Sequence, residues 1–329
     1  MDITRRRITK VLAASPLLIP TARSAFAFQA LESTSLICGF AAGGTADTMC
    51  RKVSPRLSPG YAKVAFTDNR TGAGGQIAIT YVKGRPADGT SVLMTPTSML
   101  TIYPHIYKRL AYDPAVDITP VSLGCVFNYG FAVGPTVPAS VRTAPEFLEW
   151  AKAHPEGANY GSPGAGTTAH FIGNLLGQSA GIDMRHAAYR GTQPAMLDLL
   201  GGNVSAVFGP VGDISQHLAT GKVRILAVSA EKRSRFAPSV PTFAEQGLKD
   251  MAHTEWFGFY LPAKAPRELV DRLNAELRSA LATQSVIDGL ATFGLEAMSS
   301  SSDELRSLVA KDTIKWSSIV KNAGFTVES

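Results

Sequence analysis

The sequence predicts an α/β protein of two lobes, each a mainly parallel β-sheet flanked by helices. Short β-rich runs alternate with helical patterns through most of the chain, as in parallel sheets with helical connections. About 300 residues follow an N-terminal leader, which is more than one hydrophobic core usually serves. Two glycine-rich turns, at 40–47 and 162–168, each follow a strand and open a helix. Their separation along the chain indicates one such turn in each lobe.

Each expected element rests on its local pattern. The strands are apolar or β-branched runs bounded by turn residues, and the helices show apolar residues at helical spacing. The predicted strands are Ser35–Cys38, Lys63–Asp68, Ser91–Thr95, Phe131–Val133, Ala158–Gly161, Ala187–Tyr189, Ala206–Gly209 and Ile225–Ser229. The predicted helices are Thr45–Leu57, Ala144–His154, Thr168–Ala180, Gln193–Gly201, Pro266–Thr283, Ser285–Phe293 and Ser302–Ala323.

The order of these elements sets the lobe boundaries. Strand–helix alternation falls into two dense stretches, and the C-terminal part holds too few predicted strands for a third α/β domain. We therefore expect the C-terminal part to pack on the first lobe. Lobe 1 is then 28–125 plus 230–329, and lobe 2 is 126–229. The chain would cross between them near Cys125–Tyr129 and Ser229–Arg233, where we expect the hinge of a lobe closure.

Residues 1–27 have the pattern of an export signal. Arg5–Lys10 is basic, Val11–Ala22 is a short apolar run, and Ala25–Ala27 is a small-x-small cleavage site. The apolar run is too short for a membrane span, and no longer one follows it. We expect cleavage after Ala27 and a periplasmic protein without a membrane span. The basic segment resembles a twin-arginine signal, with Thr9 in place of an apolar residue, so the general and twin-arginine routes both stay open.

The charge of the mature chain argues against polyanionic partners. The leader holds five Lys/Arg and one Asp, so 27 basic and 25 acidic residues follow it, a net charge of +2. No run of Lys or Arg remains to bind nucleic acid or anionic lipid. We therefore expect an ordinary solvated surface and no nucleic-acid partner.

Cysteine and histidine positions give no metal motif. Cys38, Cys50 and Cys125 allow at most one disulfide, and their spacing fits no zinc site. We expect buried, unpaired thiols. The six histidines are scattered, so we expect neither a metal site nor a cofactor.

The first glycine-rich turn, Phe40–Asp47, predicts an anion site made of backbone. A strand ends before Gly43 and Gly44, and a helix begins with Thr45. That geometry leaves backbone N–H groups unpaired at the positive end of a helix, where a carboxylate or phosphate binds well. Asp47 is expected to hold these N–H groups rather than to contact the ligand or to act in catalysis.

The second glycine-rich turn, Ser162–Thr168, has the same character and two alternative interpretations. Gly164 onward fits the G-x-G-x-x-A dinucleotide fingerprint, with Asp183 near the expected distance. Asp183 lies in a turn rather than at a strand end, and an exported protein has little access to NAD. Ser162 lacks the glycine two residues earlier that a nucleophile elbow requires. An anion site remains the favoured interpretation.

Three further turns lie between strands and helices. In Tyr189–Pro194, the hydroxyl of Thr192 and the amide of Gln193 are candidate ligand donors. In Phe208–Asp213, Asp213 is expected to cap the following helix. A third glycine-rich turn follows Arg70, which we expect to be structural because backbone amides suffice to bind an anion.

Taken together, these segments resemble the Bug receptors, the periplasmic solute-binding proteins of the tripartite tricarboxylate transporter family. The resemblance covers essentially the whole mature chain. The order and spacing of the motifs carry it, since no single motif is specific. The motifs are Phe40–Asp47 with Arg51, Asn69–Gly75, Asp88–Gly89, Tyr112–Pro114, Asn159–His170, Tyr189–Gly191, Asp198–Gly202, Gly221–Val228 and Val240–Thr242. Gly39 and Thr71 stand where the family usually has proline.

The resemblance implies a periplasmic-binding-protein-like, flytrap fold that is not an enzyme and has no catalytic residues. It implies binding of a small organic carboxylate, mainly through backbone amides, and delivery to a membrane permease by a monomeric receptor. Two alternatives stay open: a ligand-sensing partner of a membrane sensor, and a hydrolase that uses Ser162. The implied ligand contacts are Phe40, Ala41, Gly43, Gly44, Thr45, Asp47, Ser162, Gly164, Ala165, Gly166, Thr167, Thr168, Thr192, Gln193 and Asp213.

Overall fold

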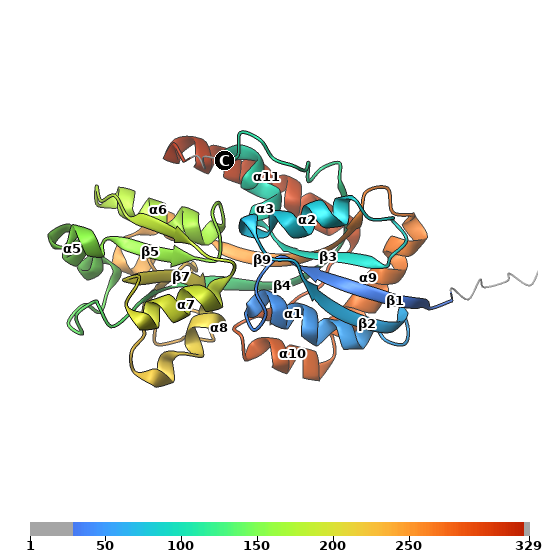
Figure 1. Cartoon of the computed structure of the whole chain (residues 1–329), viewed down its shortest axis with the longest axis horizontal. Coiled ribbons are helices and arrows are strands. Elements are labelled where there is room, and N and C mark those ends of the chain that lie inside the picture. The colour runs from blue at the N-terminus through green and yellow to red at the C-terminus, as the bar shows by residue number, and fades with distance from the viewer. Residues whose placement is uncertain (1–28, 326–329) are drawn as a thin grey trace, which may run out of the picture.

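The computed structural model describes residues 29–325, and the expected leader with its cleavage site lies outside them. Two α/β lobes lie side by side, and one sheet runs through both (Figure 1). The strands are β1 (Leu31–Cys38), β2 (Ala62–Asn69), β3 (Ser91–Pro96), β4 (Ile118–Val133), β5 (Asn159–Ser162), β6 (Arg185–Ala188), β7 (Ala206–Pro210), β8 (Arg224–Val228), β9 (Thr254–Pro262) and β10 (Glu296–Ala297).

Helices cover both faces of this sheet in each lobe (Figure 1). The α-helices are α1 (Thr45–Val53), α2 (Gln76–Lys83), α3 (Ser98–Thr101), α4 (Tyr103–Ile106), α5 (Ala144–Ala153), α6 (Thr168–Ser179), α7 (Thr192–Gly201), α8 (Val211–Ser215), α9 (Arg267–Leu281), α10 (Gln284–Ala291) and α11 (Ser302–Ala323). Short 3₁₀ helices are η1 (Ser54–Leu57), η2 (Ala73–Gly75), η3 (Pro155–Gly157), η4 (Leu218–Thr220), η5 (Ala244–Gln246) and η6 (Lys249–Met251). The predicted two-lobed α/β fold is confirmed.

Parallel pairs form the outer parts of the sheet and antiparallel pairs form its middle. The strand order is β2-β1-β3-β9-β4-β7-β5-β6, with β8 and β10 also paired to β4. β1 is parallel to β2 and β3, and β5 is parallel to β6 and β7. β9 runs antiparallel to β3 and β4, and β4 runs antiparallel to β7 and β8. The parallel strands place both glycine-rich turns at carboxyl ends, where α/β proteins bind ligands.

β4 is a single strand of 16 residues that serves both lobes. Its first part, from Ile118 to Asn128, pairs with β9 in lobe 1. Its last part, from Tyr129 to Val133, pairs with β7 and β8 in lobe 2. The chain therefore crosses from one lobe to the other inside a strand, at Asn128 and Tyr129.

Three segments meet where β4 crosses. The N–H of Ser229 donates to the carbonyl of Tyr129 at 2.9 Å, and the N–H of His253 donates to the carbonyl of Ser229 at 2.6 Å. Between Ser229 and His253 the chain packs on lobe 2, because the Phe243 ring contacts Phe131 and Phe208 and its N–H donates to β8. We therefore propose that the second crossing lies at His253, beyond the expected Ser229–Arg233.

Most predicted elements are present, and the largest omission is in the middle of the sheet. The structure has α11 at the predicted bounds, and the expected helix Thr45–Leu57 is α1 followed by η1. β9, β10 and the first part of β4 were not predicted. β9 is buried at every position except Thr254, and from Trp256 to Pro262 it is a continuous run without polar side chains on alternate positions. Such a run cannot be distinguished from a helix segment by its periodicity.

The start and end of several helices follow from capping residues in the sequence. Thr143 and Glu146 form a capping box at the start of α5, and Ser301 and Glu304 form one at the start of α11. α7 ends at Gly201, and its C-cap is Gly202, whose φ of +78° favours glycine. These local signals explain why the helix starts were predicted more closely than the central strands.

The core holds all three cysteines as buried free thiols, as expected. Within residues 29–325, no group of His, Cys, Asp and Glu side chains is arranged to hold a metal ion. No helix in the same range is long and apolar enough to cross a membrane.

Candidate functional site

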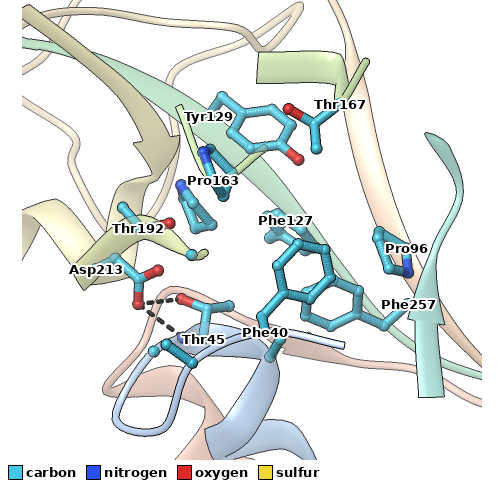
Figure 2. Close-up of a pocket in the computed structure, with 15 residues that line it drawn as sticks. Phe40, Thr45, Pro96, Phe127, Tyr129, Pro163, Thr167, Thr192, Asp213 and Phe257 are labelled. Atoms are coloured by element: carbon cyan, nitrogen blue, oxygen red, sulfur yellow. Dashed lines mark hydrogen bonds between the residues drawn. The ribbon is translucent and has the colours of Figure 1, made fainter. Parts of the chain in front are cut away.

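A pocket of ≈ 430 Å³, open space at its mouth included, lies where the two lobes meet. Its walls come from the first glycine-rich turn and α1 in lobe 1, from β3, β4 and β9 in the middle, and from the turns after β5, β6 and β7 in lobe 2 (Figure 2). It is lined by Phe40, Ala41, Gly44, Thr45, Ala46, Pro96, Phe127, Tyr129, Pro163, Thr167, Gly191, Thr192, Pro210, Asp213 and Phe257.

The predicted contact residues divide into two groups. Seven of them line the pocket: Phe40, Ala41, Gly44, Thr45, Thr167, Thr192 and Asp213. Eight do not: Gly43, Asp47, Ser162, Gly164, Ala165, Gly166, Thr168 and Gln193. Among these eight, the Gln193 side chain is hydrogen-bonded to His217, with 3.1 Å between Oε1 and Nε2.

Asp47 organises the first turn from outside the pocket. Its carboxylate accepts hydrogen bonds from the N–H of Gly43 at 2.9 Å, from Arg51 Nε at 2.7 Å and from Asn69 Nδ2 at 2.9 Å. Burial acts to raise the pKa of Asp47, but these hydrogen bonds outweigh it and hold the pKa below its ordinary value. Asp47 thus holds the loop in place, and Gly43 adopts the φ of +83° that the turn requires.

Asp213 joins lobe 2 to the N-terminus of α1 in lobe 1. Its Oδ1 accepts hydrogen bonds from the backbone N–H of Thr45 at 2.7 Å and from the Thr45 hydroxyl at 2.6 Å (Figure 2). The expectation that Asp213 caps its own helix was wrong, because Pro210 is the N-cap of α8 and Asp213 bonds 168 residues away. Burial raises the pKa of Asp213 to about 6, against hydrogen bonds that act to lower it.

The second glycine-rich turn satisfies most of its polar groups internally. The hydroxyl of Thr167 donates to the carbonyl of Gly164 at 2.8 Å and accepts from the N–H of His170 at 3.3 Å. The carbonyl of Ala165 accepts hydrogen bonds from the hydroxyls of Tyr103 at 3.1 Å and Tyr107 at 3.0 Å, both in lobe 1. This turn therefore holds the lobes together and presents Pro163 and Thr167 to the pocket.

Ser162 has a histidine partner but belongs to the core. Its Oγ lies 2.7 Å from Nε2 of His186, and the hydroxyl also donates to the carbonyl of Gly164 at 3.0 Å. The side chain is fully buried and does not line the pocket. Burial lowers the pKa of His186 to about 4. A solute in the pocket would not reach this hydroxyl, so the pair does not form a nucleophile and base for a bound substrate.

The aromatic wall of the pocket was not predicted. Phe127 and Tyr129 come from β4 and Phe257 from β9, with centroid distances of 4.6 Å between Phe127 and Phe257 and 5.6 Å between Phe127 and Tyr129. The other residues that sequence reasoning missed are Ala46, Pro96, Pro163, Gly191 and Pro210. The expected hinge at Cys125–Tyr129 was the one signal that pointed to this wall.

Behind the aromatic wall lies a second buried carboxyl. Glu255 on β9 is fully buried, and its Oε2 accepts a hydrogen bond from the Tyr129 hydroxyl at 3.2 Å. Its Oε1 accepts from the backbone N–H of Ser98 at 3.4 Å. The Thr168 hydroxyl faces the same carboxyl but makes no hydrogen bond within the described chain. Burial raises the pKa of Glu255 to about 7.

Comparison with known proteins agrees with this geometry. The model of the tripartite tricarboxylate transporter family receptor, TctC, matches residues 33–325. R. palustris Rpa4515, solved with adipate, is 29% identical with a TM-score of 0.83, covering 89% of this chain and 98% of that one. The periplasmic binding protein BugD is 27% identical with a TM-score of 0.83, covering 90% and 99%.

A third solved structure extends the likeness to a different ligand. MatC from Rhodopseudomonas palustris, with bound malate, is 25% identical with a TM-score of 0.82 and covers 88% of this chain and 98% of its own. The sequence resemblance to the Bug receptors is confirmed by these matches. Over nearly its whole described length, the chain belongs to the tripartite tricarboxylate transporter receptor family.

Proposed function

We propose that this protein captures a small organic carboxylate between its two lobes in the periplasm and delivers it to the permease of a tripartite tricarboxylate transporter. The observation that carries the proposal is the pocket at the meeting of the lobes, walled by helix N-termini. The adipate and malate bound to Rpa4515 and MatC support a carboxylate as the ligand. Family members are solute-binding receptors and not enzymes, as expected from the sequence.

Backbone amides supply the donors for this carboxylate. Gly44 and Ala46 line the pocket at the start of α1, and Gly191 and Thr192 line it at the start of α7. Within residues 29–325, the N–H groups of these four residues make no hydrogen bond. Unpaired N–H groups at helix N-termini bind anions well, and lobe closure strengthens the bond by excluding water.

Export and delivery complete the proposal. The mature receptor would begin after Ala27, act as a monomer and present its closed form to the permease. Closure on a bound solute is supported by contacts that already join the lobes around the pocket. The N–H of Ala41 in lobe 1, for example, donates to the carbonyl of Arg190 in lobe 2 at 2.9 Å.

A thermal-shift screen of mono-, di- and tricarboxylates tests this function. A ligand at 1,000 times its Kd should add about 4 kcal/mol to the free energy of unfolding and raise the Tm accordingly. Mass spectrometry of solute that co-purifies with the protein should identify a carboxylate of the same class. A screen without any stabilising carboxylate would contradict the proposal.

A further inference from the structure

The pocket has an aromatic end and a polar end. The aromatic end is formed by Phe40, Pro96, Phe127 and Phe257, which Figure 2 shows together and apart from Asp213 at the polar end. The ring centroids of Phe127 and Phe257 lie 4.6 Å apart. None of these four side chains carries a hydrogen-bond donor or acceptor. A ligand that reaches this end therefore contacts side-chain carbon atoms.

The backbone at the aromatic end is engaged as well. Phe257 on β9 lies opposite Pro96 of β3 on one side and opposite Cys125 of β4 on the other, so its backbone faces neighbouring strands. Pro96 has no N–H. The carbonyl of Phe40 accepts a hydrogen bond from Asn69 Nδ2 at 3.0 Å. A polar substituent on a ligand would therefore find few backbone partners at this end.

The hydroxyl groups on the rest of the wall already have partners within the protein. Of the fifteen described residues that line the pocket, four carry a hydroxyl, and none is Asn, Gln, Arg, Lys, His or Trp. The hydroxyls donate from Thr45 to Asp213 at 2.6 Å, from Thr167 to Gly164 at 2.8 Å and from Tyr129 to Glu255 at 3.2 Å, and that of Thr192 interacts with Asp213. The side chains of this wall therefore offer no free donor to a ligand.

The acceptor positions of Asp213, the one carboxyl on the wall, are also in use. Its Oδ1 accepts both the N–H and the hydroxyl of Thr45, at 2.7 and 2.6 Å. The side chains of Thr192 and Gln193 interact with the same carboxyl. A carboxylate has about four lone-pair positions, which these groups match in number. A ligand hydroxyl would have to displace one of them to bond here.

The free donors of the wall are backbone N–H groups at the polar end. Those of Gly44 and Ala46 at the start of α1, and of Gly191 and Thr192 at the start of α7, make no hydrogen bond within residues 29–325. A carboxylate accepts strong hydrogen bonds from such groups. The carboxylate of a ligand is therefore satisfied at the polar end, and its body extends toward the rings.

A methylene and a hydroxyl on that body differ sharply in what burial does to them. A methylene against the rings gains hydrophobic stabilisation. A hydroxyl in the same place loses its hydrogen bonds to water and finds no partner in the wall.

We propose that the ligand is a carboxylate whose body is an unhydroxylated hydrocarbon, aliphatic or aromatic, and that the pocket disfavours hydroxy acids and sugar acids. This inference rests on the proposed function and narrows it to a substrate class. The ligand body lies against Phe40, Phe127 and Phe257. The preference is defined between ligands that carry the same number of carboxylates.

Pairs of ligands with the same carbon skeleton and charge test the inference by isothermal titration calorimetry. The pairs are hexanoate and gluconate, adipate and galactarate, and cyclohexanecarboxylate and quinate, and the members of each pair differ only in their hydroxyl groups. We expect the unhydroxylated member to bind at least about tenfold more tightly, because several hydroxyls would be buried without partners. If neither member of a pair binds, the best hit of the thermal-shift screen and its hydroxylated or deoxygenated analogue take its place.

Phe40→Thr supplies a variant at the aromatic end. It removes one ring and places a hydroxyl there, so the preference for the unhydroxylated ligand should narrow by at least threefold. Phe66→Thr is the matched control, because Phe66 is 48% exposed and does not line the pocket, and it should leave the preference unchanged. Circular dichroism checks that both variants fold, and the ratios measured on the wild-type protein decide the inference if Phe40→Thr does not.

Each outcome has a defined meaning. Equal or tighter binding of the hydroxylated members, or a screen whose hits are all hydroxy acids, overturns the inference and leaves the proposed function standing. An unchanged preference in folded Phe40→Thr overturns the assignment of the preference to the aromatic end. If no carboxylate of any class binds, the proposed function itself fails.

Discussion

Glu255→Gln is the sharpest single test of the electrostatics at the crossing between the lobes. Glu255 is fully buried on β9 and accepts hydrogen bonds from the Tyr129 hydroxyl and the Ser98 N–H. Burial raises the pKa of its carboxyl from 4.5 to about 7. Glutamine keeps the shape of the side chain but cannot ionise; its amide oxygen can accept from the Ser98 N–H, and its NH2 group can donate to the Tyr129 hydroxyl.

The sign and size of the effect follow from the two pKa values. Between pH 4.5 and about 7 the folded state holds this proton and the unfolded state has lost it, so the free energy of unfolding falls as pH rises. Each pH unit between the two pKa values lowers the free energy of unfolding by about 1.36 kcal/mol. Above about pH 7 the decrease is complete and amounts to roughly 3 kcal/mol. The variant should therefore be more stable than wild type by up to about 3 kcal/mol at pH 8, and by much less at pH 5.

Urea unfolding of both proteins between pH 5 and pH 8 measures this difference. Glu231→Gln, at an exposed glutamate, is the control and should show no such trend. The difference between variant and wild type is the useful quantity, because it cancels the other titrating groups. A difference that does not grow by at least about 1 kcal/mol over this range would refute the account of Glu255 as a costly buried acid.

Three further predictions concern lobe contact and pH. A Cβ at Gly212 would lie 1.7 Å from the carbonyl oxygen of Phe293 in lobe 1, so Gly212→Ala should hold the lobes apart. The radius of gyration in solution scattering should then increase, and carboxylate binding should weaken at least tenfold. Thr45→Val removes a hydroxyl donor to the buried Asp213 and should cost about 1.5–3 kcal/mol in urea unfolding at pH 8. Burial lowers the pKa of His186 to about 4, so this side chain is compatible with the folded state only while it is neutral. The free energy of unfolding should therefore fall as the pH drops below 6.5, and this fall should be smaller in His186→Gln.

Two of these variants have a matched control. Gly201→Ala, at a helical glycine whose Cβ would meet only Nδ2 of Asn203, at 3.6 Å, should leave the scattering profile and the affinity unchanged. His154→Gln, at an exposed histidine, should not alter the acid dependence. If Gly212→Ala closes normally on its ligand, or Thr45→Val unfolds like wild type, the contacts between the lobes contribute less than their geometry indicates.

The fold class and the position of the pocket could be predicted from the sequence, but the aromatic end of the pocket could not. The turn at Phe40 and the turn before Thr168 were predictable because Gly, Thr and Asp at strand-to-helix transitions act locally. Phe257 was missed because β9 is buried on nearly all positions and shows no alternation. Asp213 was assigned to its own helix because a contact with a residue 168 positions away has no local signal.

The same limit explains why the first turn is not simply an open anion site. Local geometry correctly indicates backbone N–H groups at the start of α1. It also indicates that Asp47 holds backbone N–H groups of this turn, as its bond with Gly43 confirms, but it cannot indicate that the carboxylate of Asp213 takes the N–H of Thr45. How many donors remain for a solute depends on side chains brought there by the tertiary fold.

The shared strand β4 has a consequence for how this protein unfolds. Lobe 1 pairs with it through β9, and lobe 2 through β7 and β8, so neither lobe has a complete sheet without the other. Melting either half would strip β4 of backbone partners and expose the edge of the surviving half. The two lobes should therefore behave as one cooperative unit, with the slowest-exchanging amides of both lobes protected by the same global free energy.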